Sequence, residues 1–113
     1  MTVYRAAAME TIDRLLDLDL SVALDRIDGA TVIKATIPAT ASRPARLPFV
    51  VVTDTHEGES LPAGDNLCAA VYAPLLGGGM EIVGYLYDGP HDLDGLADKV
   101  AAWIADPDAY RPF

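Results

Sequence analysis

The sequence has few of the residues that several classes of protein require. A single cysteine among 113 residues excludes an internal disulfide framework and a cysteine-rich zinc site. Eight lysines and arginines stand against 17 aspartates and glutamates, and the formal net charge of −9 argues against nucleic-acid binding through clustered cations. No apolar run reaches the ~18 residues needed to span a bilayer, and the N-terminus lacks a basic start. We therefore expect neither a membrane span nor a secretory signal.

Apolar residues, by contrast, are plentiful. They make up 51% of the chain, which is enough to offset the entropy of folding and excludes a disordered protein. A length of 113 residues predicts a single domain, 1–113, with one core. Because closed homo-oligomers are common, we expect part of the apolar surplus to lie at a contact between subunits. The lone thiol fits a reducing cytoplasm.

Two segments have the period of an amphipathic helix. Residues 3–17 place apolar side chains on one face, from Tyr4 through Ala8 and Ile12 to Leu16. Residues 92–105 repeat the pattern from Leu93 to Ile104, and Asp92 stands where an N-cap is expected. The sequence therefore predicts one helix near each end of the chain.

The segments between these helices alternate or are continuously β-branched, as strands are. Strands are predicted at 21–27, 31–37, 47–53 and 80–87, and the 47–53 strand is apolar enough to be covered on both faces. Residues 66–73 fit a strand or a helical turn, and we favour the strand. Because strands follow one another between terminal helices, the fold class is α+β. We expect a mostly antiparallel sheet of about 4–5 strands, with both helices packed on one face.

This arrangement predicts the core. The sheet residues of the core are Phe49, Val50, Val51, Val52, Ile82 and Leu86, and the helix residues covering them are Ile12, Leu15, Leu96, Val100 and Ile104. In this prediction residues 80–87 alternate strictly, so Ile82 and Leu86 share one face while Val83 and Tyr85 share the other.

Several residues have side chains capable of chemistry, but each is better explained by structure. Asp54, His56, Glu57 and Glu59 include metal ligands, yet glycine and proline beside them favour a solvated acidic loop. Apolar neighbours make Cys68 a small core residue rather than a nucleophile. The glycines at 77–79 precede a strand rather than the helix of a phosphate loop. We therefore expect no catalytic residues, no bound metal and no cofactor, and the chain is not predicted to be an enzyme.

The order of these segments resembles the tail-terminator proteins of long-tailed bacteriophages, of the lambda minor tail protein U type. The resemblance rests on four features: the 5–16 helix, the 47–53 strand entered through a proline, the acidic loop 56–59, and the 80–87 strand that leads into the 93–104 helix. Tail-completion and head–tail joining proteins share this layout and remain an alternative. The stretch 67–79 has no counterpart in the family.

The resemblance implies a virion structural protein without catalytic activity. Such proteins form a ring, expected to be a hexamer, at the head-proximal end of the tail tube, where they stop tube polymerisation and offer a surface to the head connector. The implied partners are the chain itself, the tube protein and the connector, with no sequence-specific nucleic acid and no membrane. The implied location is the virion tail, after assembly in the host cytoplasm.

Two of the eight cations, Arg43 and Arg46, lie in one predicted loop, 38–46. In a ring we expect them to meet Glu57 and Glu59 of a neighbouring subunit, where opposite charges set the register of the contact. Two other functions remain open. A protein-binding adaptor would display one large apolar patch as a monomer or dimer. A small cytoplasmic enzyme would use the acidic loop 54–59 and line a pocket with perturbed carboxylates.

Overall fold

A computed structural model describes residues 3–27, 29–38, 48–54, 61–74 and 77–107. Two helices flank five strands in the chain: α1 (Val3–Leu16), β1 (Ser21–Ile27), β2 (Ala30–Thr36), β3 (Phe49–Thr53), β4 (Asn66–Pro74), β5 (Met80–Pro90) and α2 (Leu93–Ala105). The predicted helices and strands are all present. The ambiguous stretch 66–73 is the strand β4, which confirms the favoured interpretation.

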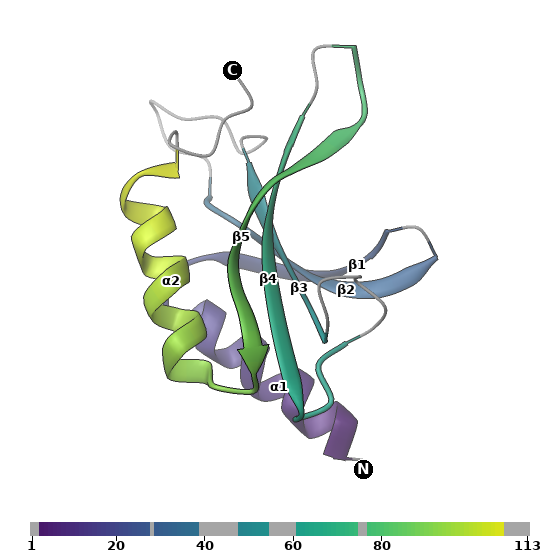
Figure 1. Cartoon of the computed structure of the whole chain (residues 1–113), viewed down its shortest axis with the longest axis vertical. Coiled ribbons are helices and arrows are strands. Elements are labelled where there is room, and N and C mark those ends of the chain that lie inside the picture. The colour runs from purple at the N-terminus through teal and green to yellow at the C-terminus, as the bar shows by residue number, and fades with distance from the viewer. Residues whose placement is uncertain (1–2, 28, 39–47, 55–60, 75–76, 108–113) are drawn as a thin grey trace.

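The five strands form one sheet in the order β1-β2-β3-β4-β5, and every neighbouring pair is antiparallel. Each strand therefore pairs with the next along the chain, and no helical crossover is needed. The protein has the predicted α+β fold, with an antiparallel sheet and two helices (Figure 1). This topology leaves β1 and β5 as the two edges of the sheet.

Both helices cover the same face of the sheet (Figure 1). Leu15 of α1 and Leu96, Val100 and Trp103 of α2 are each fully buried, together with alternate residues of β2, β3 and β4. Ile12 and Ile104, also predicted to cover the sheet, pack against this cluster from its margin. An ion pair between Arg14 and Asp94 links the two helices at the surface.

The opposite face, which we call the helix-free face, has a small apolar cluster of its own. It consists of Val32, Phe49 and Val51, with Ile27 and Tyr72 packed against it. All five residues of β3 are buried, so the prediction of a strand covered on both faces is confirmed. The prediction that the helices cover Phe49 and Val51 is wrong, because strand alternation places both residues on the other side of the sheet from Val50 and Val52.

The prediction that Ile82 belongs to the core is also wrong, since 41% of its surface is exposed. The pairing of β4 with β5 shifts register twice, so Leu86 and then Val83 are extra residues on β5. Each such bulge reverses which side of the sheet the following residues face. As a result Val83, Leu86 and Tyr87 all contact the helix-side core, a spacing that strict alternation does not produce.

Candidate interaction surface

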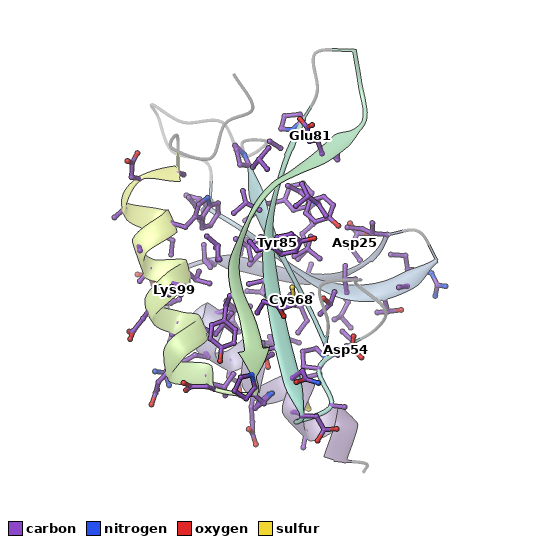
Figure 2. All side chains as sticks on the ribbon, viewed as in Figure 1. Asp25, Asp54, Cys68, Glu81, Tyr85 and Lys99 are labelled. Carbon is purple, nitrogen blue, oxygen red and sulfur yellow. The ribbon has the colours of Figure 1, made fainter. Side chains whose placement is uncertain are left out.

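Three exposed apolar side chains of β5 lie on the helix-free face, and the bulge at Val83 places the third of them, Tyr85, beside the other two. Directly opposed residues of antiparallel strands share a face. Met80 lies opposite Pro74, Ile82 opposite Tyr72, and Tyr85 opposite Ala70, all on that face. We call Met80, Ile82 and Tyr85 the β5 apolar row; their exposed fractions are 52%, 41% and 49%. In Figure 2, Tyr85 lies on the sheet, whereas Lys99 lies on α2, to the left of the sheet.

An aromatic pair lies beside this row. The rings of Phe49 and Tyr72 stack with centroids 5.7 Å apart and an interplanar angle of 15°. The ammonium of Lys34 lies 4.4 Å from the centroid of the Phe49 ring, and its Nζ is 3.9 Å from Oδ2 of Asp25. Strand pairing explains the arrangement, because Phe49 opposes Tyr72 and Lys34 opposes Val51 on one face. The surface is therefore an apolar row beside the stacked rings of Phe49 and Tyr72 and the Lys34 ammonium, which contacts both the Phe49 ring and the Asp25 carboxylate.

Cys68 lies on the same face but is buried, which confirms its predicted place in the interior. Burial raises the pKa of its thiol to about 11, and the charges of Asp88 and Asp54 add to the rise, whereas a hydrogen bond with Thr53 opposes it. Figure 2 shows Cys68 within the sheet, between the labelled Tyr85 and Asp54. A thiol held protonated in this way is a poor nucleophile at neutral pH.

The predicted ring contact cannot be placed on this surface. Arg43, Arg46, Glu57 and Glu59 lie outside the described residues, and so does His56 of the acidic loop. Asp54 is described and is half-buried at the end of β3. Among the described residues, no three histidine, cysteine or acidic side chains come close enough together to hold a metal ion. No described helix is long and apolar enough to cross a membrane.

The other candidates are structural in the fold. Asp92 caps α2, where its side chain accepts a hydrogen bond from the backbone N–H of Gly95 at 3.1 Å. Trp103 is fully buried in the helix-side core, and its indole N–H has no hydrogen-bond partner. Both ring nitrogens of His91 are likewise buried without a partner. Sequence reasoning missed the β5 apolar row because the bulge at Val83 is what places Tyr85 on the same face as Met80 and Ile82.

Comparison with known proteins found no relatives. No protein-family model matches the chain. No curated protein and no solved structure matches it either.

Proposed function

We propose that the chain is a ring-forming virion structural protein of the tail-terminator type. The observation that carries the proposal is the β5 apolar row, which presents Met80, Ile82 and Tyr85 on one face of an edge strand. An assembly protein needs such a surface, because exposed apolar groups that cluster on one face mark protein–protein contacts. The resemblance to tail terminators rests on a predicted order of helices and strands, and the helices and strands occur in that order in the structure.

The energetics of the row favour a contact with protein. Burying a large apolar side chain stabilises an assembly by about 1.5–3 kcal/mol, and these three residues are about half exposed in the isolated chain. Their remaining surface therefore offers on the order of 3 kcal/mol to each contact. A ring repeats each contact around its axis, so a modest interface energy per subunit suffices for closure.

The acidic composition suits the same role. A formal net charge of −9 on each subunit repels the phosphates of DNA. In a ring on the tail tube this charge would let DNA pass through the lumen without adhering. The proposal thus assigns the apolar row to subunit contacts and the overall charge to the passage of the genome.

The proposal is tested with a double variant, Ile82→Asp with Tyr85→Asp, and the control Met9→Asp. Met9 is 50% exposed on α1, so the control adds one charge of the same sign to an exposed apolar site away from β5. Native mass spectrometry measures ring mass, and electron microscopy measures tail length in phage complemented with each variant. We expect rings and normal tails from the wild type and the control, and monomers with overlong tails from the double variant.

Normal rings and tails from a folded double variant would contradict the role of the apolar row. A wild-type chain that stays monomeric with tubes present and leaves tail length unchanged would contradict the ring itself, and would favour the adaptor. The predicted contact of Arg43 and Arg46 with Glu57 and Glu59 stays a prediction. The charge reversal Arg43→Glu with Arg46→Glu can enter the same assay.

A further inference from the structure

The two edges of the sheet differ in how well they are protected against further pairing. Edge strands present unpaired backbone groups, which proteins shield with bulges, prolines or charges. β5 has such devices: two bulges, Pro90 at its end, and the acidic Glu81 and Asp88. A regular strand cannot pair along this edge without a break in register.

β1 has no bulge, proline or glycine. All of its residues pair with β2 in unbroken register, from Ser21 opposite Thr36 to Ile27 opposite Ala30. Five of its seven side chains are exposed. Figure 1 shows the hairpin of β1 and β2 projecting away from the helices. The outer edge of β1 is therefore a regular seven-residue template for another strand.

The two charged side chains of β1, Asp25 and Arg26, contact residues of the hairpin that β1 forms with β2. Oδ1 of Asp25 accepts a hydrogen bond from the backbone N–H of Arg26 at 2.7 Å, and Oδ2 lies 3.9 Å from Nζ of Lys34. The Arg26 guanidinium donates to the backbone carbonyl of Gly29 at 2.7 Å. These internal contacts offset the charges that would otherwise oppose an incoming strand.

We propose that β1 pairs in antiparallel fashion with β1 of a second copy of the chain, about a two-fold axis at Leu24. In this register Leu24 lies opposite the partner's Leu24, Ala23 opposite the partner's Asp25, and Val22 opposite the partner's Arg26. All seven residues of the strand are then paired, and no like charges are opposed. A two-fold axis at Asp25 or at Arg26 would set two like charges face to face, which selects the Leu24 register.

Leu24 supplies the apolar contact at the axis. It is 56% exposed, the largest exposed fraction among the described large apolar side chains, and it lies opposite the buried Ile33 of β2. Pairing joins the two sheets into one of ten strands and covers both Leu24 side chains. Because a single strand pair is smaller than a standard interface, the dimer forms weakly and depends on concentration. A two-fold contact closes on itself, so this inference does not rest on the proposed ring.

A cysteine at the axis tests the register directly. In a Cys68→Ala background, Leu24→Cys places two thiols on opposed residues, whose Cα atoms are ~4.5–5.5 Å apart in antiparallel pairs, within disulfide range. The matched variant Val22→Cys places its thiols four residues apart along the strands, ~13 Å, which is too far. Under mild oxidation we expect covalent dimers from Leu24→Cys and few from Val22→Cys. Equal cross-linking of the two variants, or none from Leu24→Cys, would overturn the register.

Sedimentation equilibrium tests the contact without a cross-link. Leu24→Lys sets two ammonium groups against each other at the axis. We therefore expect the dimer dissociation constant of this variant to be at least tenfold larger than that of the wild type. Met9→Lys, at a similarly exposed site on α1, is expected to dimerise as the wild type does. A wild type that stays monomeric up to millimolar concentration, or a Leu24→Lys variant that dimerises unchanged, refutes the inference. A larger ring that persists in Leu24→Lys would support the proposed function and would show that the ring does not depend on the contact between β1 strands.

Discussion

Cys68 shows how an environment determines the chemistry of a single residue. The side chain is one of the few on the chain with nucleophilic potential, and its apolar neighbours in sequence predicted that it is buried. The structure places it on β4 with 2% of its surface exposed, near Asp54 and Asp88. Burial and two negative charges all disfavour the thiolate, so its pKa rises to about 11 from the usual 9.0.

This rise predicts a pH dependence of stability. Between about pH 9 and pH 11 the unfolded chain loses the thiol proton while the folded chain keeps it, so the free energy of unfolding falls as pH increases. Cys68→Ala removes this contribution. We expect denaturant melts of the wild type to lose more stability than those of Cys68→Ala over this range, while the two curves run parallel from pH 6 to 8.

Thiol labelling provides the control. A disulfide reagent is expected to react with the native wild type at pH 8 far more slowly than with the unfolded chain. Fast labelling of the native protein, or identical pH profiles for the two chains, would contradict the assigned environment.

At the scale of an element, the start of α2 is the part that the sequence predicts best. An acidic residue just before the apolar repeat predicts that Asp92 caps the helix, and its side chain does accept a hydrogen bond from the Gly95 N–H. We expect Asp92→Ala to lower the free energy of unfolding by about 0.5–2 kcal/mol. Asp98→Ala, an exposed acid later in the same helix, is expected to change it by less than about 0.5 kcal/mol.

Chemical denaturation of the two variants checks the cap, with helix content from circular dichroism as a second measure. Equal losses from Asp92→Ala and Asp98→Ala would mean that charge near the helix start matters and the hydrogen bond does not.

β5 is the element that the sequence predicts least well. Its existence followed from alternation, but its two bulges depend on how it pairs with β4, which no local pattern in either strand records. Because Val83 is an extra residue between them, Ile82 and Tyr85 lie on one face, and Tyr85 thereby joins the β5 apolar row. The alternation of residues within one strand therefore does not predict a surface that depends on how two strands pair.

At the scale of the molecule, the class of fold followed from the order of segments. Successive strands without intervening helices favour antiparallel pairing, because parallel pairing needs a long crossover, and two amphipathic helices at the ends of such a run favour an α+β fold. Composition does not record that the apolar core divides into two clusters on opposite sides of the sheet. That division arises because β2, β3 and β4 bury both of their faces.

The division of the core predicts different effects on stability for substitutions of Val51 and Ile82, although the sequence pattern places both residues in the core. Val51 is 4% exposed in the cluster on the helix-free face, whereas Ile82 is 41% exposed on the edge strand. An unpaired charge in the interior costs several kcal/mol, comparable to the whole stability of a small domain, so Val51→Asp is expected to abolish folding even though no helix covers it. Ile82→Asp leaves its carboxylate in water and is expected to change the free energy of unfolding by less than about 1 kcal/mol.

Thermal melts followed by circular dichroism, with size-exclusion chromatography, distinguish an unfolded variant from a folded one. A cooperatively melting Val51→Asp would show that the helix-free cluster is dispensable, and an unfolded Ile82→Asp would restore Ile82 to the core and remove it from the β5 apolar row.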